Sequence, residues 1–286
     1  MLQVARRGAA ALGDSADLVR SFVRASLGPS GAARDRAGKE DLYYTIFALA
    51  CLQALDEPVP AAELRGFLRA FGKGDGLDFV HLGAFARCWA VVGGGDPGLR
   101  CAVLERLEQF RSGDGGYEAE LGSAHGSAYG GFVALGAYQD LGASVPEGLR
   151  LVQSLKWLET PDGAWGNAPG MPVGSTNPTA AAVTLLHQLE VPVADRVSLW
   201  LRQRAHVHGG FLAMPSAPIP DLLSTATTLH ALSCLDERVD GSLREKTLDF
   251  LDSLWSAEGG FHGHWADDEL DVEYTFYGLL ALGHLQ

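Results

Sequence analysis

The stretch Glu258-Gly259-Gly260-Phe261 is a Gly-rich turn that stands ahead of a long apolar run, residues 272–285. The same kind of turn recurs earlier in the chain, as Gly74-Asp75-Gly76, Gly113-Asp114-Gly115-Gly116-Tyr117, Asp162-Gly163-Ala164-Trp165 and His208-Gly209-Gly210-Phe211. The glycines at 76, 116, 163, 210 and 260 lie 40, 47, 47 and 50 residues apart. Self-similarity of this period is typical of repeat architectures. The sequence therefore predicts a chain built of repeated units.

Each repeat combines two kinds of predicted helix. Amphipathic helices with one charged face precede the turns, at 99–110, 148–158, 194–204 and 242–255. Helices that are apolar on all sides and rich in Ala and Gly follow, at 42–55, 79–92, 128–141, 179–189, 222–235 and 272–285. A helix that is apolar all round must be buried on every side. We therefore expect the second set to form the interior.

Two concentric rings satisfy both sets, with the buried helices inside and the amphipathic helices outside. The predicted fold is all-α, an α/α toroid of about six helical hairpins, in which residues 1–286 form a single domain. An open superhelix of stacked hairpins is the alternative, but it would expose one face of its terminal repeats. The run 272–285 is as apolar as any other and carries no polar cap. Closure into a ring is therefore favoured.

Composition narrows the class of partner. The 286 residues carry a net charge of -13 and are 47% hydrophobic, which argues for a globular core and against nucleic-acid binding. Cys51, Cys88, Cys101 and Cys234 are scattered without close pairs and are interpreted as buried thiols. No secretion signal and no apolar stretch of the ~20 residues that a membrane span needs is visible. We expect a cytoplasmic protein without a membrane span.

Four short motifs are spread along the chain: Ser127-Ala128-Tyr129, Pro169-Gly170-Met171, Gly209-Gly210-Phe211 followed by Asp221, and Asp271 through Thr275-Phe276-Tyr277-Gly278-Leu279. By these motifs nearly the whole chain resembles the superfamily of protein prenyltransferase β subunits and squalene and terpene cyclases. The resemblance implies the α/α toroid fold and an isoprenoid or other apolar ligand.

The resemblance also locates the family's chemistry and shows where this chain departs from it. Of the zinc ligands of the prenyltransferases, Asp221 is retained, while Leu223 and Tyr274 stand at the Cys and His positions. A catalytic zinc needs three protein ligands, so the family's zinc site is not predicted here. No other cofactor is predicted either. The loop 212–220 contains no basic residue to grip a diphosphate. The run 221–226 is similar to the cyclase acid motif but lacks its two later aspartates.

An Asp opens three of the predicted inner helices, at Asp41, Asp221 and Asp271. These belong to the first, fifth and sixth repeats, which are neighbours in a closed ring, so their carboxylates could converge at the cavity mouth. Like-charge repulsion and burial would then raise at least one pKa and create a catalytic acid. The alternative is that each Asp only caps its helix.

Two histidines, His262 and His264, lie near Asp267 and Asp268 in the loop before the last helix. This set is chemically suited to a replacement divalent-metal site. The alternative is that the histidines are ordinary surface residues of a Gly-rich loop.

Aromatic residues are frequent on the predicted inner helices: Tyr43, Tyr44, Phe47, Phe85, Trp89, Tyr129, Phe132, Tyr274, Phe276 and Tyr277. They could line a cavity that binds an isoprenoid chain and stabilises carbocations with their π faces. Alternatively they fill the centre of the ring or pack against the outer helices.

Two hypotheses for function follow. The first is an enzyme of isoprenoid metabolism that uses an acid from the set Asp41, Asp221 and Asp271. The second is a non-catalytic protein, either a carrier of an apolar ligand or a subunit that pairs with a partner chain.

Overall fold

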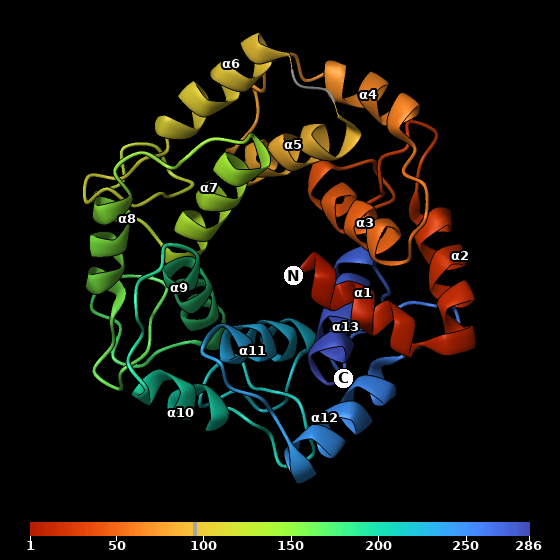
Figure 1. Ribbon diagram of the computed structural model, residues 1–286, viewed down its shortest axis with the longest axis vertical. Helices are drawn as coiled ribbons and strands as arrows, with labels where there is room; N and C mark the ends of the chain where they lie inside the picture. The colour runs from red at the N-terminus through yellow and green to blue at the C-terminus, as the bar shows by residue number, and fades with distance from the viewer. Residues whose placement is uncertain (94–95) are drawn as a thin grey trace.

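The computed structural model describes residues 1–93 and 96–286, and it is a closed double ring of helices (Figure 1). The inner ring contains α3 (Leu42–Ala54), α5 (Phe79–Val92), α7 (Ala128–Asp140), α9 (Thr176–Gln188), α11 (Leu222–Cys234) and α13 (Val272–His284). The outer ring contains α2 (Ala16–Ser26), α4 (Ala61–Arg69), α6 (Pro97–Glu108), α8 (Gly148–Ser154) with η2 (Leu155–Leu158), α10 (Arg196–Arg202) and α12 (Gly241–Leu254). The predicted α/α toroid of six hairpins is confirmed.

Closure brings the first and last repeats into contact. The rings of Phe47 on α3 and Phe276 on α13 lie 5.9 Å apart, centroid to centroid. In the outer ring, the Gly-rich loop of the last repeat reaches back to the first outer helix, because a Cβ on Gly259 would lie 2.2 Å from the Leu18 carbonyl oxygen on α2. The predicted adjacency of the chain's first and last hairpins is therefore confirmed.

The recurring glycines of the turns have a steric cause. Gly209 and Gly259 have φ angles of +90° and +94°, which L side chains rarely adopt. A Cβ on Gly209 would also lie 1.9 Å from the carbonyl oxygen of Lys246 on α12. The loops of Gly209 and Gly259 thus rest on the backbone of the next outer helix, at a distance that leaves no room for a side chain.

Most inner helices begin at a side-chain cap, as the sequence suggests. Asp41, Asp221 and Asp271 each accept a hydrogen bond from a backbone N–H in the first turn of the helix. Helix α9 begins at Thr176, three residues before the predicted start at 179. Pro178 is compatible with this earlier start, because N–H groups in the first turn of a helix need no intrahelical partner.

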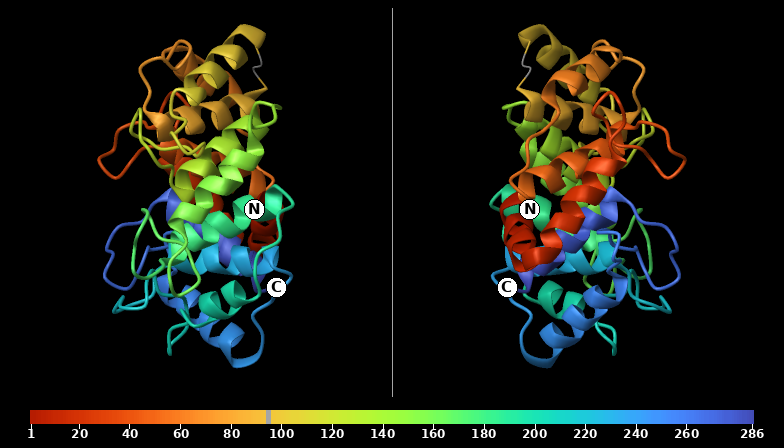
Figure 2. Two further views of the ribbon diagram at one scale, coloured as in Figure 1. Left: turned by 90° about the vertical axis from the view of Figure 1, so that its left-hand side faces the viewer. Right: turned by 90° about the vertical axis from the view of Figure 1, so that its right-hand side faces the viewer.

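The long loops and the chain termini lie at opposite ends of the ring. Figure 2 shows long loops on one side of the molecule and both chain ends toward the other side. Helix α1 (Leu2–Ala11), which the sequence analysis did not predict, precedes the short helix η1 (Gly13–Ser15) and packs closely against α13. No helix in the described part of the chain has the length and hydropathy of a membrane span.

The prediction that all four cysteines are buried is wrong for one of them. Cys51 and Cys88 are buried on inner helices and Cys234 is half-buried. Cys101 is exposed, because it lies on the outer helix α6.

Candidate functional site

The centre of the ring contains a cavity of about 450 Å³, which is within the range of small-molecule sites. Its wall comes mainly from α3, α5, α7 and α13, with Met1 and Leu2 from the N-terminal segment and Gln188 from α9. Six of the ten aromatic residues that the sequence places on the inner helices line it: Tyr43, Phe47, Tyr129, Phe132, Phe276 and Tyr277. Tyr43, Phe47, Phe276 and Tyr277, on α3 and α13, form an aromatic surface on one sector of the wall, and Tyr129 and Phe132 lie on α7.

This surface is held together by ring-to-ring contacts. Phe47 lies 5.1 Å from Tyr43 in an edge-to-face arrangement and 5.6 Å from Tyr277 across the junction of α3 and α13. On the opposite wall, 46% of Tyr129 remains exposed on α7. Aromatic faces thus stay accessible inside the cavity.

The other four predicted aromatic residues, Tyr44, Phe85, Trp89 and Tyr274, lie outside this lining. Phe85 is fully buried and packs against Phe71 and Trp89, so it belongs to the packing between helices. Tyr44 and Tyr274 follow the capping Asp residues at the N-terminal ends of α3 and α13, outside the cavity lining. The Arg36 guanidinium lies over the Tyr274 ring, 5.5 Å from its centroid.

A carboxyl group that the sequence analysis did not select lies beside the aromatic surface. The Tyr43 hydroxyl, on the cavity wall, donates a 2.6 Å hydrogen bond to Glu273 Oε1. Burial raises the pKa of the Glu273 carboxyl, and the nearby Asp271 carboxylate raises it further, while Tyr43 and Arg36 act in the opposite direction. The Glu273 carboxyl therefore holds its proton more tightly than an exposed glutamate does.

The position of Glu273 relative to the start of its helix could have been used to predict that it lies near the cavity. It stands two residues after the capping Asp271, as Tyr43 stands two residues after Asp41 and Tyr129 two residues after the cap Ser127. Tyr43 and Tyr129 both line the cavity. Aligning the repeats on their caps would have predicted that Glu273 points toward the ring's centre.

Two of the predicted acids are paired with basic side chains. Asp41 Oδ2 lies 3.0 Å from His81 Nε2, and His81 Nδ1 lies 2.8 Å from Asp78. Arg36 Nε donates a 2.8 Å hydrogen bond to Asp271 Oδ2, and the same guanidinium binds Asp267 at 2.9 Å. Asp41 and Asp271 therefore join loops and helices at the mouth of the ring.

The third predicted acid, Asp221, has a different environment. It caps α11 through a 2.7 Å hydrogen bond from the Ser224 backbone N–H. Burial raises the pKa of its carboxyl, whereas this capping interaction and His264 act in the opposite direction. Among the described residues, no hydrogen bond links Asp41, Asp221 and Asp271 to one another.

The loop histidines do not gather with the acids around a common point. His262 Nδ1 contacts the backbone oxygen of Glu269, and His264 Nδ1 accepts a hydrogen bond from the Ala266 N–H. Asp267 is held by Arg36. Within residues 1–93 and 96–286, no three His, Cys, Asp or Glu side chains lie close enough together to hold a metal ion.

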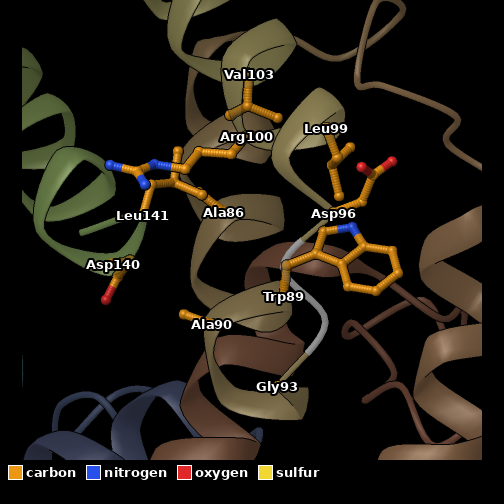
Figure 3. A pocket seen from close by; sticks show the side chains of 10 residues that line it. All are labelled: Ala86, Trp89, Ala90, Gly93, Asp96, Leu99, Arg100, Val103, Asp140 and Leu141. Carbon is orange, nitrogen blue, oxygen red and sulfur yellow. The ribbon is translucent and has the colours of Figure 1, made fainter. Parts of the chain in front are cut away.

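A second hollow, of about 230 Å³, lies between α5 and α6 (Figure 3). In Figure 3 the Trp89 indole lies with Leu99 and Asp96 on one side, while Arg100 extends toward α7. Arg100 there donates a 2.8 Å hydrogen bond to the Gly142 backbone oxygen. Of the aromatic residues proposed from the sequence, the described lining contains Trp89.

Fold and site together define an α/α toroid with an aromatic central cavity. Residues 179–286 match the family model of the prenyltransferase alpha-alpha toroid domain. A search of curated protein sequences gave no match. The resemblance to prenyltransferases and terpene cyclases that the sequence motifs suggest is confirmed.

Solved structures share this fold at low sequence identity. A variant of the type II terpene cyclase MstE from Scytonema, in complex with its substrate geranylgeranyl dihydroxybenzoate, has 14% identity and a TM-score of 0.63 over 97% of each chain. Candida albicans protein geranylgeranyltransferase-I, complexed with GGPP, has 13% identity and a TM-score of 0.71 over 94% of this chain and 90% of that one. A protein from Actinoplanes has 16% identity and a TM-score of 0.58, with 95% and 98% covered.

Proposed function

We propose that the protein binds a linear isoprenoid chain in its central cavity and that Glu273 supplies a proton to it. The observation that carries this proposal is the contact between Tyr43 and Glu273, which sets a carboxyl group with a raised pKa beside an aromatic surface. The solved relatives bound to geranylgeranyl compounds agree with an isoprenoid as the ligand class.

The aromatic surface is suited to such a chain for two reasons. Removing a branched hydrocarbon from water is favourable by about 25 cal/mol per Å² of apolar surface. The faces of Tyr43, Phe47, Tyr129 and Tyr277 also attract a carbocation through their π electrons. The cavity therefore stabilises both the neutral chain and a positive charge that develops on it.

The hydrogen bond from Tyr43 organises the acid. Because Tyr43 donates to Oε1, the proton of the neutral carboxyl is carried by Oε2. The π electrons of a substrate alkene take this proton and form a C–H bond, which leaves a tertiary carbocation and the Glu273 carboxylate. The cation then loses a different proton to water after rearranging or closing a ring, and solvent reprotonates Glu273. The reaction is an isomerisation and needs no co-reactant.

Asp221 is the second candidate for the acid, because burial raises its pKa too. The catalytic roles of Asp41 and Asp271 stay predictions, and a hydrogen bond to His81 or Arg36 occupies one carboxylate oxygen of each. A carrier without chemistry, alone or with a partner chain, is the alternative function.

Incubation with geranylgeraniol in D₂O, followed by mass spectrometry, tests the proposal. We expect the wild-type protein to yield isomers that contain carbon-bound deuterium. Glu273→Gln should abolish their formation, while Asp221→Asn should retain it. Loss of deuterium in Asp221→Asn alone would assign the acid to Asp221, and binding of geranylgeraniol without any isomer would favour the carrier.

A further inference from the structure

The cavity has a polar end opposite its aromatic end. Its lining includes a polar rim, which we define as Gln53, Arg87, Gln139, Asp140 and Gln188. The residues of this rim lie in the middle or C-terminal part of α3, α5, α7 and α9, whereas Tyr43 and Tyr129 lie in the first turns of α3 and α7. A ligand that fills the cavity along the ring axis therefore meets hydrocarbon-binding and hydrogen-bonding groups at different ends.

The rim is connected across three helices. Arg87 Nε donates a 2.6 Å hydrogen bond to Asp140 Oδ2, which joins α5 to α7. Gln139 Nε2 donates a 2.9 Å hydrogen bond to Gln188 Oε1, which joins α7 to α9. The guanidinium also passes close to Gly136, since a Cβ there would lie 3.5 Å from Arg87 Nη2. The contacts hold the polar groups at one level of the cavity.

Arg87 keeps donor capacity for a ligand. Its side chain is 47% exposed, and Nε is the guanidinium nitrogen that binds Asp140. Asp140 is 20% exposed and offers carboxylate oxygens on the same wall. A group that both donates and accepts hydrogen bonds can therefore be bound by the pair.

The charges of the rim select against a strongly anionic group. Among the described side chains that line the cavity, Arg87 is the one cation and Asp140 the one anion, and burial lowers the pKa of the Met1 ammonium, so the cavity lining has little net charge. Burial already raises the pKa of Asp140 despite the opposing effect of Arg87, and a second anion nearby would add repulsion. A diphosphate needs several cationic partners, and the loop 212–220 also contains no Lys or Arg.

We infer that the polar rim binds the hydroxyl head of a free prenyl alcohol, with Arg87 donating to the head oxygen and Asp140 accepting its proton, and that it discriminates against prenyl diphosphates. This inference rests on the proposed binding of an isoprenoid in the cavity. It specifies the head group of the ligand and its orientation, with the chain directed toward Tyr43 and Glu273.

Calorimetric titration with three probes that share one chain tests the inference: geranylgeraniol, its methyl ether and geranylgeranyl diphosphate. We expect the wild-type protein to bind the alcohol at least tenfold more tightly than either other probe. Arg87→Met should weaken binding of the alcohol about fivefold to tenfold, which corresponds to one hydrogen bond, and it should weaken binding of the ether as well, because the ether oxygen also accepts a hydrogen bond from Arg87.

The isosteric variant Asp140→Asn supplies a second test that does not depend on Arg87. It leaves the Arg87 charge unbalanced, so we expect the diphosphate to gain affinity by tenfold or more while the ether is unaffected. Circular dichroism and thermal unfolding of each variant check that it is folded.

The outcomes separate the two claims. If the wild-type protein binds all three probes equally, the assignment of the head group is overturned. If Phe276→Ala then weakens this binding, the cavity is still the binding site. Tighter wild-type binding of the diphosphate would also overturn it. Absence of binding of every probe would reject the proposed function itself.

Discussion

The hydroxyl oxygen of Tyr43 on α3 lies 2.6 Å from Glu273 Oε1 on α13, so one hydrogen bond joins the first and last inner helices of the ring. This contact helps to close the ring, and it also includes the proposed proton donor, Glu273. The contribution of the contact to stability can be measured apart from any catalysis, because a carboxyl group with a shifted pKa makes stability depend on pH.

The first prediction concerns Glu273. Its pKa is raised from the ordinary value of 4.5, mainly by burial, so the folded chain holds the proton more tightly than the unfolded chain. The stability that this proton contributes is complete below about pH 4.5 and is lost as the pH rises through the folded pKa. We expect Glu273→Gln to remove this loss. In urea unfolding, the stability of the variant relative to the wild type should therefore increase between pH 4.5 and 7. The exposed Glu245→Gln is the control, and parallel pH curves for Glu273→Gln and the wild type would contradict the prediction.

The second prediction concerns Tyr43. Tyr43→Phe keeps the ring in the aromatic surface but removes the hydrogen bond to Glu273. The free energy of unfolding at neutral pH should fall by about 0.5–1.5 kcal/mol. Because the hydrogen bond lowers the pKa of Glu273, its removal should move the pH-dependent loss of stability to higher pH. An unchanged pH profile with a normal loss of stability would indicate that Tyr43 has no effect on the carboxyl.

The third prediction concerns Arg36, which joins the loop before α3 to the capping residue of α13. Its guanidinium is one-third exposed, but the Asp271 side chain that it pairs with is only 5% exposed. Arg36→Met leaves this carboxylate without its cation, and we expect a loss of about 1.5–3 kcal/mol, toward the lower end because solvent reaches Arg36. Glu147→Gln, which removes one charge of the exposed pair with Arg150, should cost about 0–1 kcal/mol. Chemical unfolding compares the two, and equal losses would contradict the special role of Arg36.

The fourth prediction concerns two histidines at the C-terminal side of the inner ring. His230 Nδ1 and His284 Nε2 lie 3.1 Å apart, and burial, assisted by nearby positive charges, lowers their pKa values to about 3 and about 4. Because these values lie below the ordinary 6.5, the stability that the neutral pair contributes is complete above pH 6.5 and is lost as the pH falls toward 4.

Replacing both histidines with Gln should flatten the stability curve between pH 6.5 and 4. The change in unfolding free energy across this interval should be on the order of a few kcal/mol smaller than in the wild type. His208→Gln, at an exposed position in a Gly-rich loop, is the matched control. A double variant that remains as acid-sensitive as the wild type would refute this prediction.

The fifth prediction concerns the contact between α1 and α13. A Cβ on Gly8 would lie 1.9 Å from the Leu279 carbonyl oxygen, so Gly8→Ala forces the helices apart. We expect a cost of about 1–3 kcal/mol and faster hydrogen exchange along α1. Gly66→Ala on α4 is the control, because no atom lies within 4 Å of the added Cβ and Ala favours the helix by up to about 1 kcal/mol. Unchanged exchange in Gly8→Ala would show that α1 is not held by this contact.

The repeat of Gly-rich turns and apolar helices was enough to predict the ring and its closure. Spacing, apolar faces and capping Asp residues are local properties of the chain, and each acts within a few residues of its own position. The start of α9 was placed three residues late, because the cap Ser175 stands before a Pro in the first turn and makes no side-chain capping bond that would strengthen the signal. Helix α1 was missed because its stability comes from packing against α13.

The choice of Glu273 as the proposed acid depended on the tertiary structure. Asp41, Asp221 and Asp271 share one sequence pattern, yet His81 pairs with the first, burial dominates at the second and Arg36 pairs with the third. Glu273 has no distinctive motif, and its partner Tyr43 lies 230 residues away in the sequence. A pKa and a cavity wall arise from contacts between such distant residues, so the sequence determined the ring, and only the closed ring decided which carboxyl stands beside its aromatic centre.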